Sequence, residues 1–268
     1  MNIFLAVMLF MLGAGLGSFA CCQVWRIRKG DKSRWSHCMH CDYRLQWYDN
    51  IPIISWLSLG GRCRKCRKKI GAMEILAEVL TALVFVAVWL LWPEQEAVMA
   101  GSIPEVMRFV IFLAMLTCFC ICFIYDAKWQ ELPMVPVYIS IALSLLYLGT
   151  IWAPQLASCS FEIAELWTAL GGVLILPGFY LFMYKLSHEK WVGGGDYILC
   201  IPMAVVLAEF WLSISTLFIS NLIGCLIMLP VIYFRKNKDT KIALGPFLIL
   251  GFLVVFFAKD FIMGFVRF

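Results

Sequence analysis

The chain has 268 residues and a net charge of +5, and 63% of its residues are hydrophobic while only 15% are charged. Soluble domains contain roughly 45–50% apolar and about 25% charged residues, so this composition excludes an ordinary soluble globular protein. The apolar residues form long continuous runs, as membrane-spanning helices do, since a span needs about 20 mostly apolar residues and must satisfy its own backbone hydrogen bonds. The sequence therefore predicts an all-α, polytopic integral membrane protein.

Eight transmembrane helices are predicted along the chain. The first covers residues 2–24, and we interpret it as a retained span with its N-terminus outside, because no Lys or Arg precedes it as a signal peptide would require. The sixth is short for a span. The other seven predicted spans lie near residues 73–92, 106–125, 133–153, 163–185, 197–209, 211–234 and 243–265.

The distribution of basic residues predicts the orientation. Segment 26–72 carries twelve of the 22 Lys and Arg residues against three acids, and Lys and Arg accumulate on the cytoplasmic side of membranes. The predicted organisation is a first transmembrane helix at 1–25, a small cytoplasmic domain at 26–72 and a membrane-embedded domain at 73–268. Later loops on the same predicted side carry Lys185, Lys190, Arg235, Lys236, Lys238 and Lys241.

The cytoplasmic segment contains two Cys-x-x-Cys pairs, Cys38 with Cys41 and Cys63 with Cys66, separated by 21 residues. Four cysteines in two such pairs are typical of zinc ribbons, in which thiolates bind the metal tetrahedrally. A segment of this length holds little hydrophobic core, and a metal would supply the missing folding energy. Two disulfides or a redox pair are the alternative, which the reducing cytosol disfavours. We expect a structural Zn²⁺ site in a zinc-ribbon-like loop.

Two aspartates stand beside predicted spans, where acidic residues are functional candidates by default. Asp126 follows an apolar run, Asp196 follows the triple glycine at 193–195, and both are predicted at the cytoplasmic membrane edge. Two neighbouring carboxyl groups cannot both ionise, so one can take a proton from water while the other polarises a scissile carbonyl. The glycines permit positive φ and a close backbone approach. The alternative is that Asp196 only caps a helix.

Glu74 and Glu78 lie four residues apart, on one helix face near the same predicted edge. They could bind a basic peptide or its new amine, or they could neutralise the nearby Arg67, Lys68 and Lys69. The basic loop is tethered to the membrane, so we expect lipid headgroups and no nucleic acid as its partner.

Seven motifs in order along almost the whole chain resemble those of the prepilin peptidase (type IV leader peptidase) family. They are Gly15-Leu16-Gly17-Ser18-Phe19, the two Cys-x-x-Cys pairs, Asn50-Ile51-Pro52 with Ser55-Trp56-Leu57, Glu78-Val79-Leu80-Thr81, Asp126 with Leu132-Pro133, Gly193-Gly194-Gly195-Asp196, and Leu244-Gly245-Pro246-Phe247.

The resemblance implies a multi-pass aspartic endopeptidase of the bacterial inner membrane. Such an enzyme cuts the basic leader from type IV pilin or pseudopilin precursors at the cytoplasmic face. Asp126 and Asp196 would be catalytic, while Gly193, Gly194, Gly195 and Glu78 would support the substrate or the loops. Many members also methylate the new N-terminus with S-adenosylmethionine.

The chain departs from the family pattern at several places, for example at Ile198, where a lysine is common two residues after the second aspartate. These departures leave the aspartate pair intact and bear more on methylation. A non-catalytic membrane adaptor that docks through its zinc loop is the alternative function. A proton-coupled transporter would need acids nearer the middle of the bilayer, which the deep parts of the spans lack.

Overall fold

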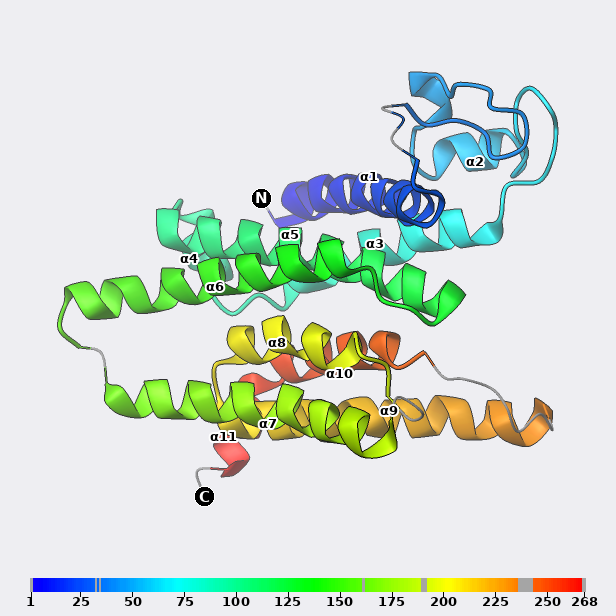
Figure 1. Cartoon of the computed structure of the whole chain (residues 1–268). Helices are drawn as coiled ribbons and strands as arrows, with labels where there is room; N and C mark the ends of the chain where they lie inside the picture. Colours follow the sequence, from blue (N-terminus) through cyan, green and yellow to red (C-terminus); the bar gives the residue numbers. More distant parts are fainter. Residues whose placement is uncertain are drawn as a thin grey trace. The chain divides into compact units, whose positions relative to one another are not determined.

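The structure, a computed structural model, describes residues 2–31, 33, 35–160, 162–188, 192–235 and 243–266. Over these residues the chain is α-helical and has no β-strand beyond two isolated bridges, 37 with 44 and 62 with 69 (Figure 1). Its internal contacts divide it into two compact units, Met1–Glu96 and Ala97–Phe268. The two units are described in turn.

The first unit is built on two helices that lie side by side, α1 (Asn2–Lys29) and α3 (Ala72–Leu90). Small residues allow helices without a water-driven interface to approach closely. A Cβ atom added at Gly13 would come within 2.8 Å of the Cα of Ala82, and one at Gly17 within 2.8 Å of the Cα of Glu78. At Gly15, which points elsewhere, an added Cβ would meet nothing within 4 Å. The glycines at 13 and 17 therefore form the α1 side of the contact.

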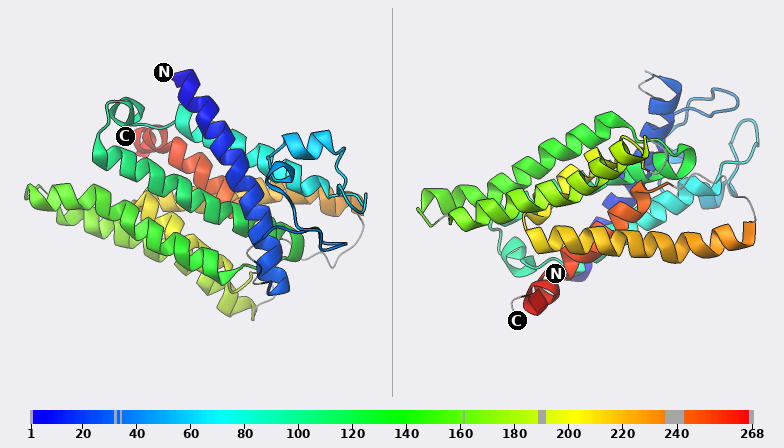
Figure 2. Two further views of the ribbon diagram at one scale, coloured as in Figure 1. Left: turned by 90° about the horizontal axis from the view of Figure 1, so that it is seen from above. Right: turned by 60° about the horizontal axis from the view of Figure 1, so that its bottom comes forward.

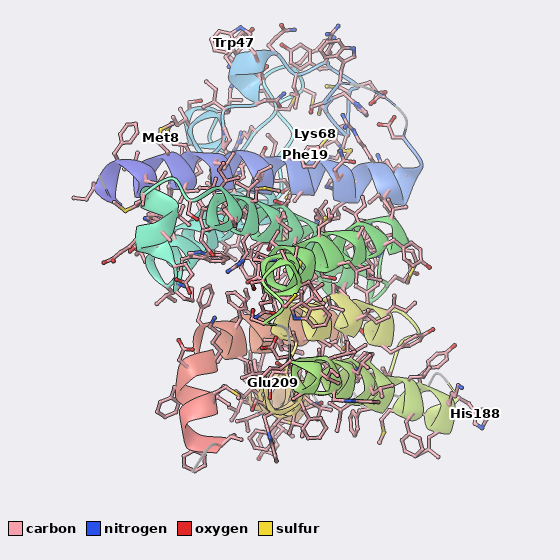
Figure 3. The ribbon with its side chains drawn as sticks, turned by 90° about the vertical axis from the view of Figure 1, so that its left-hand side faces the viewer. Met8, Phe19, Trp47, Lys68, His188 and Glu209 are labelled. Carbon is pink, nitrogen blue, oxygen red and sulfur yellow. The ribbon has the colours of Figure 1, made fainter. Side chains whose placement is uncertain are left out.

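A long loop joins α1 to α3 and contains a 3₁₀ turn (Trp47–Asp49) and the short helix α2 (Ile54–Ser58). Figure 3 shows Trp47 at the outer end of this loop and Lys68 closer to α1. The loop is tied to α3 by the backbone N–H of Ile53, which donates to Oε2 of Glu78 at 2.7 Å. A short helix, α4 (Gln95–Met99), follows α3.

The second unit is a helical bundle in which α8 contacts α6 and α7, and α10 contacts α5 and α9 (Figure 2). Its core is largely aromatic between α5 and α10, where the rings of Phe112 and Phe256 stack with centroids 4.4 Å apart. The helices are α5 (Ile103–Trp129), α6 (Met134–Ala157), α7 (Ile163–Ser187), α8 (Asp196–Leu207), α9 (Phe210–Arg235), α10 (Gly245–Phe257) and α11 (Lys259–Val266).

The helices confirm the predicted all-α membrane fold. Among the described residues, α1, α3, α5, α6, α7 and α9 are long and apolar enough to cross a membrane. The eighth predicted span is the pair α10 and α11, which is bent by 71° at Ala258 and could make a seventh crossing. The sixth predicted span, α8, has 12 residues and so extends about 18 Å, less than the roughly 30 Å hydrocarbon layer. Eight predicted spans thus become six or seven.

Part of the charge pattern that predicts the orientation falls on Lys190, Lys236, Lys238 and Lys241, which lie outside the described residues. The placement of the N-terminus outside stays a prediction. The predicted boundaries after residues 25 and 72 separate a membrane span, a cytoplasmic domain and a membrane-embedded domain. They too stay predictions, and they differ in kind from the contact division at Glu96.

Candidate functional site

Asp126 lies one turn before the end of α5 and is buried, with 4% of its surface exposed. Its Oδ2 atom accepts a hydrogen bond of 2.9 Å from the backbone N–H of Gly245, the first residue of α10. A Cβ atom at position 245 would lie 2.7 Å from this oxygen, which is closer than real Cβ contacts come. The sequence therefore lets the carboxylate reach the helix N-terminus by placing a glycine there.

Asp196 is the first residue of α8 and is 7% exposed. Its Oδ2 atom accepts a hydrogen bond of 2.9 Å from the backbone N–H of Gly193. None of the three glycines before it has positive φ, so the expected need for a left-handed backbone at these positions is not met. Their small size is used instead: a Cβ atom at Gly195 would lie 2.7 Å from the Cβ of Leu132.

Leu132 connects the surroundings of the two aspartates. Its side chain lies against Gly195, next to Asp196, and a Cβ atom at Gly245 would lie 3.6 Å from its Cδ2 atom. The charge of Asp126 also acts on Asp196. The structure thus brings the two predicted acids together at one end of the second unit, from different helices.

The sequence alone does not predict that Gly245 bonds to Asp126 or that Leu132 packs beside Gly195. Both residues nevertheless stand in motifs that carry the family resemblance. A polar pair was missed altogether: Nδ2 of the half-buried Asn221 on α9 donates to the hydroxyl of the buried Tyr180 on α7 at 2.8 Å. Tyr180 also interacts electrostatically with Asp196. An Asn within an apolar span is the signal that could have located this pair, because polar side chains are rare there.

The four predicted cysteines of the first unit come together, with their Sγ atoms all within 4.8 Å of one another. Each pair sits in the same kind of turn. The N–H of Cys38 donates to the carbonyl of Tyr43 and the N–H of Cys63 to that of Lys68, both at 2.9 Å. The residue after each second cysteine, at 42 and at 67, has positive φ.

This geometry fits a tetrahedral metal site. Four thiolates at about 2.3 Å from zinc stand about 3.8 Å apart, and Sγ of Cys38 lies 3.9 Å from Sγ of Cys66. The backbone N–H groups of Cys66 and Lys65 lower the pKa of the Cys63 thiol to about 7. At Cys41 the N–H of Tyr43 opposes a rise, but burial and the neighbouring thiols outweigh it and raise the pKa to about 11. A divalent cation would let all four thiols ionise, so the group could hold a metal ion.

The two glutamates of the first unit differ in their hydrogen bonds. Glu78 is 8% exposed and is bonded to Ile53, as described above. Glu74 makes no such bond: its Oε2 atom is buried against Gly71 and has no hydrogen-bond partner among the residues that the structure describes.

Known families match both units. The bacterial peptidase A24 N-terminal domain matches residues 11–92, and the type IV leader peptidase family matches residues 110–229. A prepilin leader peptidase/N-methyltransferase from Pectobacterium carotovorum subsp. carotovorum is 30% identical over 218 residues, which make up 81% of this chain and 71% of that relative. The chain belongs to the type IV leader peptidase family.

Two further relatives agree with this assignment. The type 4 prepilin-like proteins leader peptide-processing enzyme of Escherichia coli O78:H11 is 31% identical, over 81% of this chain and 72% of its own length. A prepilin leader peptidase/N-methyltransferase from Stutzerimonas stutzeri is 26% identical, over 87% and 75%. No solved structure matches the chain. With its apolar helices, membership of this bacterial family makes the chain a multi-pass inner-membrane enzyme.

Within the family, the two matched regions divide the candidate residues. The N-terminal match contains the four cysteines and both glutamates, and the leader peptidase match contains both aspartates. Gly245 lies beyond the matched region, yet it makes the hydrogen bond to Asp126.

Proposed function

We propose that this prepilin peptidase is an aspartic endopeptidase that removes the leader peptide from type IV pilin or pseudopilin precursors. The observation that carries the proposal is the pair of buried carboxylates, Asp126 and Asp196, held from different helices at one end of one compact unit. Buried acids in apolar helices are expensive, and a shared location gives them a common chemical use.

The chemistry follows from two acids that share one proton. The ionised carboxylate takes a proton from water, and the resulting hydroxide attacks the scissile carbonyl carbon while the protonated carboxyl donates to the carbonyl oxygen. The tetrahedral intermediate then collapses with cleavage of its C–N bond. The carboxyl that took the proton from water gives it to the leaving nitrogen, and the other carboxylate recovers its proton from the hydroxyl that becomes the new carbonyl oxygen. The hydrogen bonds from Gly245 and Gly193 each occupy one oxygen, Oδ2, and leave the other oxygen of each carboxyl for this exchange.

The proposed substrates follow from the printed names of the relatives, which process prepilin or prepilin-like proteins. We place the cut at the cytoplasmic face, with the N-terminus of the chain outside, because segment 26–72 holds most of the basic residues. The same segment would lie near anionic lipid headgroups.

In this proposal the four cysteines hold a structural Zn²⁺ ion. Four thiolate ligands leave no open coordination position, so the metal would stabilise the loop and would not activate water. The printed names of several relatives add N-methylation, and we extend that activity to this chain. S-adenosylmethionine would supply the methyl group for the new N-terminal amine.

The test of the peptidase proposal is the loss of cleavage when either acid becomes an amide. We expect Asp126→Asn and Asp196→Asn to reduce cleavage of a purified pilin precursor at least about 10²-fold, the size of a general acid–base contribution. Both variants should still bind the precursor. Asp260→Asn, at an exposed acid of α11, is the matched control and should cleave like the unchanged protein.

Full cleavage by both aspartate variants would contradict the proposed aspartic mechanism. The adaptor alternative makes the opposite prediction, namely that function survives both aspartate substitutions and is lost when Cys38 and Cys63 are replaced.

A further inference from the structure

The first unit contains a cavity of about 350 Å³, which is within the usual range of roughly 300–1,000 Å³ for small-molecule sites. Its wall is made by the second half of α1, the four-cysteine loop and the first turns of α3. The cavity is thus formed wholly within Met1–Glu96, whereas both proposed catalytic aspartates belong to Ala97–Phe268.

Four acidic side chains line this cavity, and three of them have partners. Asp31 accepts hydrogen bonds from Ser33 and lies 3.5 Å from the imidazole of His37. Asp49 accepts a bond of 2.7 Å from Arg64. The third, Glu78, holds the N–H of Ile53.

Glu74 is the exception. Its Oε2 atom is buried without a hydrogen-bond partner among the described residues, although several cations also line the cavity. Glu74 as a whole is half-buried, and only this oxygen is enclosed. Enclosed acceptor oxygens without a partner are uncommon in native structures, and a donor bound in the cavity would satisfy this one. A Cβ atom at Gly71 would lie 2.6 Å from Oε2, so the glycine leaves room for the carboxylate at this place.

The remaining wall favours a ligand that carries both charges. Lys68 and Lys69 line the cavity and could hold an anionic group. Trp25 and Trp35 also line it, and the guanidinium of Arg44 lies over the ring of Trp35 at 3.6 Å. An ammonium group is the natural partner for a lone carboxylate, because charge-assisted hydrogen bonds are the strongest in proteins.

We propose that Glu74 is the anchor of a binding site for an α-ammonium group in this cavity. Two sources of that group are compatible with the proposed function, on which the choice of ligand rests. One is the amino-acid end of S-adenosylmethionine, whose carboxylate would face the lysines. The other is the new N-terminus of the cleaved pilin. Both carry the same chemical group, and the experiment separates them.

The test measures binding to the full-length protein in detergent by isothermal titration calorimetry. The probes are S-adenosylmethionine, a short apolar peptide with a free N-terminus, and the same peptide N-acetylated. We expect at least one of the two ammonium probes to bind. Glu74→Gln should weaken its binding at least about tenfold, since a charge-assisted bond is lost. Glu96→Gln, an exposed acid of the same unit outside the cavity, should bind like the unchanged protein.

If only one ammonium probe binds, that probe identifies whether the cavity takes S-adenosylmethionine or the new pilin N-terminus. If both bind, the cavity takes both ligands. Zinc content and thermal unfolding show whether Glu74→Gln is folded. If that variant does not fold, Gly71→Ala takes its place, because the added Cβ displaces the carboxylate. The proposal is overturned if neither ammonium probe binds, if the folded variant binds as tightly as the unchanged protein, or if a bound peptide is held equally well after acetylation.

The peptidase is judged separately. Asp126→Asn should keep the ammonium binding while cleavage is lost, so failure of one proposal is distinguishable from failure of the other.

Discussion

The position of each proposed catalytic carboxylate depends on one glycine N–H. Gly245 holds Asp126 and Gly193 holds Asp196, each through Oδ2 at 2.9 Å. Gly245 is the first residue of α10, and Gly193 lies in the turn just before α8. A backbone donor in such a place fixes the carboxylate before substrate arrives, which is where catalytic positioning has its effect. Sensitivity to substitution should therefore extend to these glycines.

The first residue-scale prediction concerns Gly245→Ala. The new methyl group would lie 2.7 Å from Oδ2 of Asp126, so the carboxylate must move away from its present place. Because a misplacement of about 1 Å can reduce a rate about 10²-fold, we expect kcat for leader cleavage to fall between about tenfold and 10²-fold. KM should change much less. Steady-state kinetics on a purified precursor measure both.

Gly149→Ala is the matched control, since an added Cβ there meets nothing within 4 Å and alanine favours a helix by about 1 kcal/mol. Its kcat should equal that of the unchanged protein. Equal kcat values for both glycine variants would mean that Gly245 does not position Asp126.

The second residue-scale prediction concerns Glu78, whose carboxylate holds the N–H of Ile53. Glu78→Ala leaves this donor without its acceptor, so we expect the first unit to lose about 1–3 kcal/mol of its free energy of unfolding. Glu78→Gln keeps an acceptor oxygen and should lose less. Limited proteolysis of the loop around Ile53 measures the difference. Equal protection in both variants would show that the bond does not hold the loop.

At the scale of elements, the contact between α1 and α3 is set by which glycines face the partner helix. A Cβ at Gly17 would meet backbone atoms of Ala77 and Glu78 at 2.8 Å, and backbone atoms cannot move aside as a flexible side chain does. We expect Gly17→Ala to lower the free energy of unfolding of the first unit by about 1–3 kcal/mol, the range of an overpacked core. Thermal unfolding in detergent measures the change.

The control is two residues away on the same helix. Gly15→Ala adds a methyl group that meets nothing within 4 Å, so its unfolding temperature should not fall. Alanine favours a helix over glycine, so helix propensity alone would stabilise both variants. A loss of stability at Gly15 as large as at Gly17 would therefore mean that the contact with α3 does not account for the effect.

Sequence periodicity and charge predict the helices well, because a lipid-facing helix must be apolar along its whole length. They predict less well where a helix bends or is interrupted. The 71° bend between α10 and α11 occurs at Ala258, with neither Pro nor Gly there, and only the adjacent Lys259 and Asp260 hint that the apolar span has ended.

The candidate site shows the same limit at long range. Asp126 and Asp196 are found from the sequence because acids beside spans stand out. Their supports are not, since Gly245 lies 119 residues from the carboxylate that it holds. Likewise Glu74 and Glu78 occupy one helix face, and only the position of Ile53, 25 residues before Glu78, distinguishes the bonded acid from the unpaired one.

For the whole molecule, the two compact units carry different chemistry. The four-cysteine cluster and the cavity belong to Met1–Glu96, and the aspartates with their glycine and leucine supports belong to Ala97–Phe268. If the cluster holds the proposed metal and the aspartates form the proposed peptidase centre, the two sites belong to separate units and should fail separately. Loss of the metal should then affect cleavage less than loss of an aspartate does.

The last prediction removes the metal by replacing Cys38 and Cys63 with serine. Bound zinc should fall from about one ion per chain to none, because half of the thiolate ligands are gone. The loop should become sensitive to protease, since it holds little hydrophobic core of its own. Leader cleavage should fall by less than about tenfold, against at least about 10²-fold for Asp126→Asn.

Replacement of the exposed Cys159 and Cys225 is the control and should leave zinc content unchanged. If the double cysteine variant folds and yet loses cleavage as completely as the aspartate variant, the metal loop takes part in the peptidase reaction and the two units do not act separately.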